Sequence, residues 1–281
     1  MLHKLMLRGM AIAGAMMVAA LLSSGTASAA EDVVMDGSTT VGPIAKAFAE
    51  YYMENNPDVN ITVSESGSGN GAKSLINSTC DIANMSRFMK GSEFTAAVEA
   101  GVTPVAHIVA LDGIAVIVHP SNPLKEITLA QLKDVYQGKI KNWSQLGGPN
   151  VKIVAISRDT NSGTYETFEG IVMQKEKMAE GIEYVGSNGA VRSRVQSTQA
   201  AIGYVGVGFL DRSVKGLAVE GIMPSTETVK TGEYAISRPL FMLTNGVPKM
   251  GSTLWKFVNL YLSRKGQEIV EEIGFVPVTN Y

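Results

Sequence analysis

Short apolar runs alternate with amphipathic segments along most of the chain. The apolar triplet at 33–35 and the segment 61–63, with Thr62 between two apolar residues, fit brief strands, and the first is followed by Ile44, Phe48 and Tyr51 at helical spacing. A buried strand reads as a short continuous apolar run, whereas a helix repeats its apolar face about every 3.6 residues. The alternation of these two patterns predicts strands separated by helices, which is typical of an α/β fold.

The same alternation continues into the second half of the chain. The sequence predicts extended segments at 108–118, 151–156 and 201–205, a helix around 168–172 and a C-terminal helix over 254–262. The strand-like and helix-like segments are not sorted into separate parts of the chain. We therefore expect α/β architecture throughout.

Residues 1–29 have the composition of a secretory signal peptide. Lys4 and Arg8 give a positive start, 10–22 is an apolar run, and 27–29 fit a small-residue cleavage site. The run of 13 residues is shorter than the roughly 20 that a membrane-spanning helix needs, which disfavours a permanent membrane anchor. No cysteine follows the run, so no lipid anchor is expected. The segment predicts a protein that is cleaved and released into the periplasm.

Composition narrows the classes of function. The chain has 281 residues, 45% of them hydrophobic, and a formal net charge of −2, which indicates a globular protein with a sizeable core. Loss of Lys4 and Arg8 leaves 22 basic against 26 acidic side chains, so a nucleic-acid partner is not expected. The single cysteine, Cys80, excludes an internal disulfide and a cysteine-built zinc site. We expect Cys80 to be a small buried hydrophobe, and we expect no metal and no cofactor.

One local pattern occurs three times. A strand-like segment runs into a short stretch rich in glycine, serine and threonine, and then into a helix, at 36–43, 66–71 and 158–164. Helix capping alone explains one such stretch, because serine, threonine, aspartate and asparagine satisfy free N–H groups at any helix start. Three of them, each directly after a strand, favour a shared function.

That function is the binding of a small anion. Glycine lets an oxyanion approach the backbone closely, and a helix N-terminus offers free N–H donors and the positive end of the helix dipole. Local dipoles can hold a dianion even in a chain of negative net charge. Arg158 would supply the formal counter-charge, since its planar fork suits a tetrahedral oxyanion; the alternative is a surface arginine before a turn.

Nucleotide-binding motifs are matched only in part. Gly67, Gly69 and Ala72 fit the degenerate dinucleotide fingerprint, but the acid about 20 residues later would be Glu93, which does not end a strand. The stretch at 36–43 begins like a phosphate loop, yet Pro43 stands where that motif needs lysine. Both interpretations are disfavoured.

Hydrolase motifs are missing as well. The sequence contains no G-x-S-x-G, S-x-x-K or H-E-x-x-H pattern. His107 lies in a strand-like run and His119 precedes a proline, so we expect both to be structural. Ser162 has no base partner visible in the sequence. An enzyme is therefore not expected, although an exported hydrolase of phosphate esters stays an alternative.

At the three glycine-rich stretches, and also at 81–87 and 142–148, the chain resembles the periplasmic phosphate-binding proteins of high-affinity phosphate ABC transporters. The resemblance runs over essentially the whole chain after residue 29. It implies a type II periplasmic-binding-protein fold, in which two α/β lobes joined by two crossing strands close on the ligand. The implied division is 31–112 plus 240–281 for lobe 1, and 113–239, with the hinge strands, for lobe 2.

The resemblance also implies the phosphate-binding residues. Matched position by position, they are Thr39, Thr40, Ser68, Arg158, Ser162, Gly163 and Thr164. At one further position the chain departs from the family pattern, because Ser86, followed by Arg87, stands where several members have an aspartate that accepts the proton of hydrogen phosphate. We predict that Ser86 and Arg87 belong to the site.

The serine weakens the prediction of phosphate selectivity. A carboxylate would repel sulfate, whereas a serine can donate or accept one hydrogen bond. Sulfate or another tetrahedral oxyanion therefore stays an alternative ligand, and Asp36, Glu65 and Asp159 are candidate substitute acceptors. The implied partners are inorganic phosphate and the membrane permease of an ABC transporter, to which Trp143 could contribute a contact if it is not packed under a loop. A monomer is expected.

Overall fold

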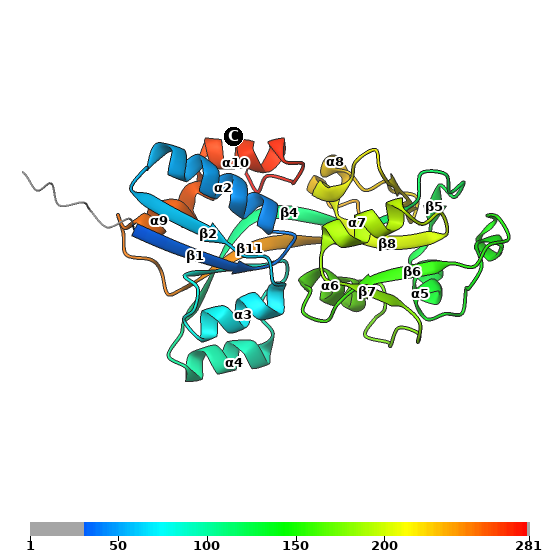
Figure 1. The fold of residues 1–281 in the computed structure, drawn as a ribbon, viewed down its shortest axis with the longest axis horizontal. Coiled ribbons are helices and arrows are strands. Elements are labelled where there is room, and N and C mark those ends of the chain that lie inside the picture. The colour runs from blue at the N-terminus through cyan, green and yellow to red at the C-terminus, as the bar shows by residue number, and fades with distance from the viewer. Residues whose placement is uncertain (1–30, 280–281) are drawn as a thin grey trace, which may run out of the picture.

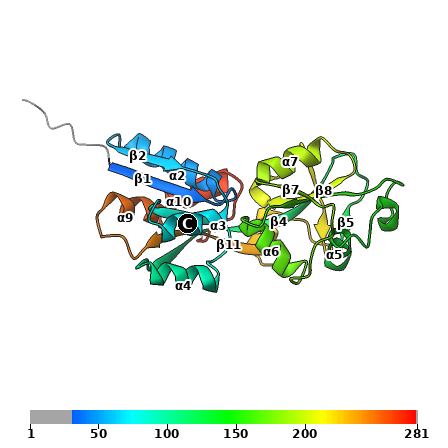
Figure 2. The ribbon, with the colours of Figure 1, turned by 60° about the horizontal axis from the view of Figure 1, so that its bottom comes forward.

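The computed structural model describes residues 31–279, so the predicted signal peptide at 1–29 lies outside the described residues. Two α/β halves lie side by side (Figures 1 and 2), joined by two long strands, β4 (Pro104–Val118) and β11 (Ser237–Asn245). We call the half that contains the N-terminal strand lobe 1 and the other half lobe 2.

The elements of lobe 1 come from both ends of the chain. They are β1 (Glu31–Gly37), α2 (Gly42–Asn55), β2 (Val59–Val63), α3 (Ser68–Ile76), β3 (Ile82–Met85), α4 (Gly91–Glu99), α9 (Thr253–Val258), the 3-10 turn η3 (Asn259–Leu262) and α10 (Arg264–Glu272). The sheet has the order β2-β1-β3-β11-β4. Strands β1, β2 and β3 are parallel, and β11 is antiparallel to both β3 and β4.

The elements of lobe 2 lie between the two long strands in the sequence. They are β5 (Glu126–Ile127), α5 (Leu129–Tyr136), η1 (Trp143–Leu146), β6 (Val154–Arg158), α6 (Gly163–Ile171), β7 (Glu183–Val185), α7 (Asn188–Gln196), β8 (Ala201–Gly206), η2 (Val207–Phe209), β9 (Lys215–Gly216), β10 (Ala218–Val219) and α8 (Thr226–Lys230). The sheet continues from β4 through β8 and β6 to β7.

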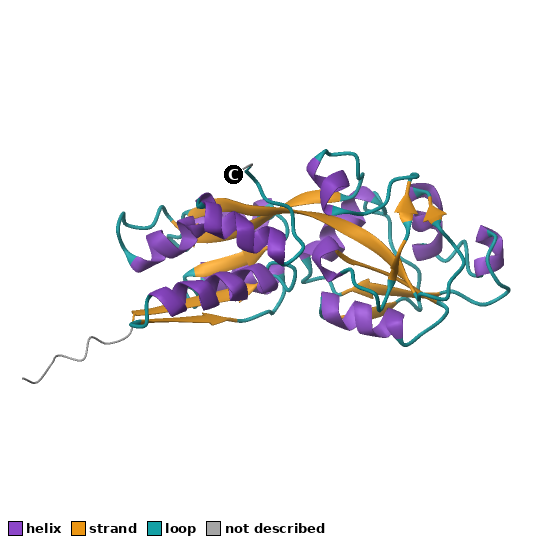
Figure 3. Cartoon of the chain, turned by 90° about the horizontal axis from the view of Figure 1, so that it is seen from above, coloured by secondary structure: helices purple, strands orange, loops and turns teal. Residues whose placement is uncertain are grey.

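Strand β4 belongs to both sheets. Its residues 104–113 pair with β11, and its residues 114–118 pair with β8 of lobe 2. Seen from above (Figure 3), β4 and β11 run from one lobe into the other. The two crossings expected from the family resemblance are thus β4 and β11, and the predicted lobe boundaries fall within these strands.

Helices lie on both sides of each sheet (Figure 1), so each lobe has apolar side chains buried on two sides. In lobe 1, Phe48 of α2 and Phe257 of α9 pack on one face, and Leu75 of α3 packs on the other. In lobe 2, Phe168 of α6 and Val191 of α7 lie on opposite faces. Because the sheets are buried on both sides, their strands read as the continuous apolar runs seen in the sequence.

Two predicted elements differ from the structure. The helix expected over 254–262 ends at Val258 and continues only as a 3-10 turn, because Ser263 accepts a hydrogen bond from the Gly266 amide and begins α10. The strand expected from residue 151 begins at Val154. Apolar periodicity alone cannot locate such ends, since they depend on capping and on where a neighbouring strand begins.

Three side chains with open roles in the sequence are buried. Cys80 is buried, and desolvation raises the pKa of its thiol to about 12, which fits a small core residue. His107 is buried beside the Thr244 hydroxyl. Trp143 is 1% exposed and its indole N–H donates to the Ala200 carbonyl, which favours packing under a loop over a partner contact. Among residues 31–279, no helix is long and apolar enough to cross a membrane.

Candidate functional site

The three glycine-rich stretches converge where the lobes meet. Thr40, before α2 of lobe 1, lies with its Oγ1 3.0 Å from Oγ1 of Thr164 in α6 of lobe 2. The Gly69 amide in α3 donates to the Asn161 carbonyl, just before α6, at 2.9 Å. The helix starts of α2, α3 and α6 therefore face one another across the interface, as the sequence pattern predicted.

A serine pair from lobe 1 lies against the first residue of α6. Ser68 Oγ is 3.2 Å from Ser86 Oγ and accepts a hydrogen bond from the Ser86 amide at 3.1 Å. A Cβ added to Gly163 would lie 2.6 Å from each of these two oxygens. Gly163 thus allows the close approach of the lobes at this point.

Ser162 caps α6. Its Oγ accepts hydrogen bonds from the backbone amides of Thr164 and Tyr165. Ser162 therefore acts as a helix cap, as helix capping alone would explain. A hydroxyl that accepts two hydrogen bonds still has its own proton to donate. Capping and anion binding are therefore compatible at Ser162.

Arg158, at the end of β6, has an unusual environment. The side chain is 1% exposed, its Nε donates to the Val185 carbonyl at 3.3 Å, and its Nη2 donates to the Gly186 carbonyl at 2.8 Å. Its Nη1 is buried and, within the part of the chain that the structure describes, has no hydrogen-bond partner. Two carbonyls therefore fix the guanidinium and leave one edge free.

Burial lowers the pKa of Arg158 to about 10, so the side chain still carries its charge at neutral pH. An ionised group without a charged partner is costly to bury. Asp159 is the acidic residue that acts most on this guanidinium, but Oδ1 of Asp159 accepts from the Asn161 amide. A bound anion would supply both the missing counter-charge and the missing acceptor.

Arg87 is placed differently from the other predicted site residues. Its guanidinium pairs with Glu93 of α4 at 2.7 Å and with Glu166 of α6 at 2.6 Å, and Glu166 also lies 3.2 Å from Lys90. Glu93 and Lys90 are in lobe 1 with Arg87, whereas Glu166 is in lobe 2. The pairing favours a role for Arg87 in holding the lobes together over direct contact with an anion.

A substitution at Glu166 tests this role. We expect Glu166→Gln to weaken ligand affinity about fivefold, because a partly buried ion pair that exists only when the lobes are closed contributes roughly 1 kcal/mol to closure. Glu93→Gln is the matched control, since Glu93 pairs with the same arginine inside lobe 1 and should leave affinity within about twofold of wild type. Titration calorimetry measures both, and equal losses in the two variants would contradict the prediction.

The candidate substitute acceptors are engaged with other protein groups. The two carboxylate oxygens of Asp36 accept serine hydroxyls, Glu65 pairs with Lys46 at 2.6 Å, and Asp159 Oδ1 accepts from the Asn161 amide at 2.8 Å. Ser86, 1% exposed and beside Ser68, is better placed to meet a protonated oxygen of a ligand.

Sequence reasoning missed three buried polar residues at this interface: Asp112, Asn188 and Arg238. Arg238 pairs with Asp112 at 2.9 Å, and its Nη2 also lies 2.8 Å from Thr164 Oγ1. A signal for them existed, because Asp112 and Arg238 interrupt strand-like stretches, and Asn188 begins a helix after a strand, a glycine and the capping Ser187.

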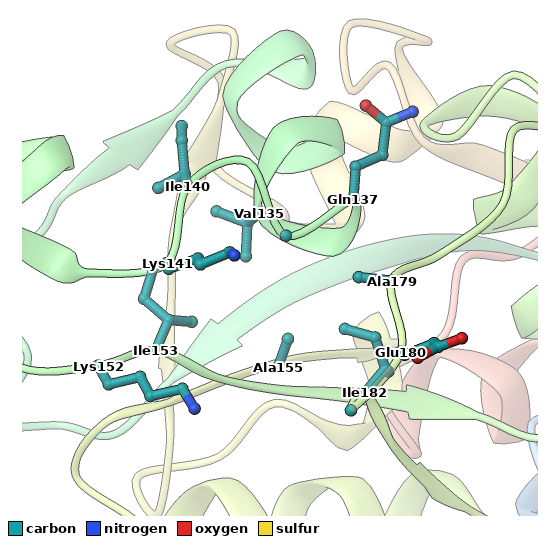
Figure 4. Close-up of a pocket in the computed structure, with 12 residues that line it drawn as sticks. Val135, Gln137, Ile140, Lys141, Lys152, Ile153, Ala155, Ala179, Glu180 and Ile182 are labelled. Atoms are coloured by element: carbon teal, nitrogen blue, oxygen red, sulfur yellow. The ribbon is translucent and has the colours of Figure 1, made fainter.

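A hollow lies within lobe 2, between the end of α5 and strand β6 (Figure 4). Its volume is about 310 Å³, and its lining is largely aliphatic with Lys141, Lys152 and Glu180 added. None of the predicted site residues lines it. Its lining lacks the buried hydroxyl groups and the buried arginine that the region between the lobes contains.

Two α/β lobes closed around buried hydroxyls and an arginine with one free edge define a two-lobed solute-binding protein. In agreement, residues 23–265 match the family model described as a PBP superfamily domain. The chain is 34% identical to the phosphate-binding protein PstS of Bacillus subtilis over 92% of this chain and 84% of that protein. The chain belongs to this PstS family of phosphate-binding proteins, which confirms the resemblance seen in the sequence.

Solved structures support the same assignment. A phosphate ABC transporter substrate-binding protein with bound phosphate from Clostridium perfringens is 35% identical, with a TM-score of 0.82 over 89% of this chain and 100% of that chain. An ABC-type phosphate transport receptor from Vibrio cholerae is 30% identical, with a TM-score of 0.71 over 87% and 99% of the two chains. The expected two-lobed fold is thus confirmed.

Proposed function

We propose that this protein is an extracytoplasmic solute-binding protein that captures inorganic phosphate between its lobes and delivers it to the permease of an ABC transporter. The observation that carries the proposal is the buried Arg158, whose Nη1 has no partner among the described residues and which ends the strand that leads into α6. The names of the relatives from Bacillus subtilis and Clostridium perfringens point to the same ligand.

In this proposal the anion is held by groups from both lobes. Lobe 1 contributes Thr39, Thr40, Ser68 and Ser86, and lobe 2 contributes Arg158, Ser162, Gly163 and Thr164. The hydroxyl side chains of this set are all buried. A desolvated anion is bound tightly only when many donors surround it, so capture requires closure of the lobes. Arg87 supports closure through Glu166.

Binding without turnover fits these residues better than hydrolysis. His107 donates to or accepts from Thr244, and His119 contacts Ser121, so neither histidine is paired with Ser162. The Ser162 oxygen serves as a helix cap. The proposal therefore includes no catalytic residue. Release outside the cytoplasm through cleavage of residues 1–29, without a lipid anchor, and a monomeric state are further parts of it.

Titration calorimetry on the chain after residue 29 tests the proposal. We expect saturable binding of one phosphate per chain, and no release of phosphate from a phosphate ester. Sulfate should bind up to about tenfold more weakly, because it lacks the proton that Ser86 can accept, while the same hydroxyl can still donate to it and one hydrogen bond contributes about 0.5–1.5 kcal/mol. Comparable affinities for the two anions would favour a general oxyanion carrier, and absence of phosphate binding would refute the proposal.

A further inference from the structure

A buried ion pair lies on the two strands that join the lobes. Asp112 of β4 and Arg238 of β11 are direct register partners. Asp112 is 0% and Arg238 6% exposed, and Asp112 Oδ2 accepts from Nε and Nη2 of Arg238 at 3.1 and 2.9 Å. Burying such an ion pair costs desolvation free energy unless further hydrogen bonds satisfy its remaining donors and acceptors. The other contacts of Asp112 and Arg238 therefore indicate the role of the pair.

Those contacts reach both lobes. Arg238 Nη2 donates to Thr164 Oγ1 at 2.8 Å and lies 3.4 Å from Thr40 Oγ1, while its Nη1 is 3.5 Å from Thr167 Oγ1. Asp112 Oδ1 accepts from the Val207 amide at 3.0 Å. The donors of Arg238 are thus directed at protein oxygens, in contrast to Arg158, which has one free edge.

Asn188 makes the corresponding contact from lobe 2 to lobe 1. Its Oδ1 accepts from the Gly206 amide at 3.2 Å, which fixes the side-chain orientation. Its Nδ2 then donates to Thr39 Oγ1 at 3.1 Å and to Thr40 Oγ1 at 2.9 Å. Asn188 is fully buried, so water does not replace these bonds when the lobes are closed.

Guanidinium and amide NH₂ groups can only donate hydrogen bonds. Each threonine oxygen that receives such a bond uses a lone pair for it, and its single proton must go elsewhere. Thr40 Oγ1 receives both Asn188 and Arg238, so its proton is directed at Thr164 Oγ1, 3.0 Å away, and the Thr164 proton is left for another acceptor. We propose that Arg238 and Asn188 are positioning residues that hold Thr164 and Thr39 as hydrogen-bond donors toward the bound oxyanion. They act through the threonines and do not touch the ligand.

This inference rests on the proposed function and adds a source of selectivity to it. Hydroxyls fixed as donors favour oxygens that carry negative charge and disfavour a protonated oxygen at the same positions. The role also requires closure, because Asn188 and Thr39 come from different lobes. Preorganised donors gain affinity because they need not reorient when the anion enters.

Crossed double-mutant cycles test the inference, with phosphate affinity measured by titration calorimetry. One variant combines Asp112→Asn with Arg238→Met, which removes both charges and keeps an acceptor for the Val207 amide. A second variant, Asn188→Ala, removes the amide contacts to the threonines. The hydroxyls are removed by Thr164→Val or Thr39→Val. Residues that act through a shared contact are coupled, whereas independent ones add.

We expect the Asp112/Arg238 variant to lose about tenfold in affinity, the value of one well-placed hydrogen bond to a charged group. In the Thr164→Val background the further loss should fall below about threefold, while in the Thr39→Val background it should stay near tenfold. Asn188→Ala should show the opposite dependence. Its further loss of affinity should be small in the Thr39→Val background and undiminished in the Thr164→Val background. Each set of threonine variants therefore serves as the control for the other.

Losses that are equal in both threonine backgrounds would overturn the positioning role and leave the proposed function intact. A wild-type protein that binds no phosphate would overturn both. Thermal unfolding checks that each variant folds; if the Asp112/Arg238 variant does not, Arg238→Lys keeps the charge beside Asp112 and must show the same dependence on Thr164. Independence of Thr164 in that variant would also overturn the role.

Discussion

Replacement of Arg158 by alanine is expected to abolish high-affinity phosphate binding while the lobes remain folded. The substitution removes the formal positive charge that we propose faces the ligand, on a guanidinium whose Nη1 has no partner among residues 31–279. Loss of one member of a buried charge pair costs about 2–5 kcal/mol of binding free energy, which corresponds to an affinity loss of about 30- to 5,000-fold. Calorimetry with phosphate measures this directly.

Folding should survive because the free protein gains little from this arginine. In the free wild-type protein, burial lowers the pKa of Arg158, so its charge is unfavourable until an anion binds. In Arg158→Ala, the carbonyls of Val185 and Gly186 lose one hydrogen bond each. Arg264→Ala is the control for net charge, since Arg264 is on the surface of α10, and it should bind phosphate as wild type does. Retained affinity in Arg158→Ala would remove this residue from the site.

Gly163→Ala is expected to have the second largest effect, through the closed state alone. The added Cβ would lie 2.6 Å from Ser68 Oγ and Ser86 Oγ and 3.1 Å from Arg87 Cγ, all in lobe 1. Overpacking of this kind costs about 1–3 kcal/mol, so affinity should fall about 5- to 150-fold. The amide of residue 163 is kept, which separates the steric effect from the loss of a donor.

The stability of Gly163→Ala should not fall, because alanine is the better helix former and Gly163 begins α6. Gly170→Ala is the matched control: Gly170 is in the same helix, and a Cβ there would meet nothing within 4 Å. We expect that variant to bind phosphate normally. Calorimetry and thermal unfolding on both variants decide the matter, and normal binding by Gly163→Ala would show that the lobes need not approach this closely.

The sequence predicted the fold class and five of the eleven strands in the described part of the chain, because buried strands leave apolar runs. It was less accurate at element ends such as Val258 and Val154, where capping and strand pairing decide. The helix starts of α2, α3 and α6 were visible because their glycine and hydroxyl pattern is local. Arg158 and Ser162 were predicted with them, since they lie in the same short stretch.

The prediction for Arg87 shows what a local motif leaves open. Arg87 follows Ser86 directly, so a linear motif placed both in the site. The structure pairs the arginine with Glu93 and Glu166, and the second of these is 79 positions away in another lobe. A sequence pattern gives residue types and spacing, but it does not show which charges meet.

Local sequence therefore determined which segments can offer donors to an anion, because capping residues and glycines act within a few positions of the backbone they serve. Only the tertiary structure decided that these segments meet and what supports them. Arg238 lies 74 positions from Thr164, and Asn188 lies 149 positions from Thr39. Contacts over such separations depend on how β4 and β11 bring the lobes together, and the spacing of residues along the chain carries no trace of that packing.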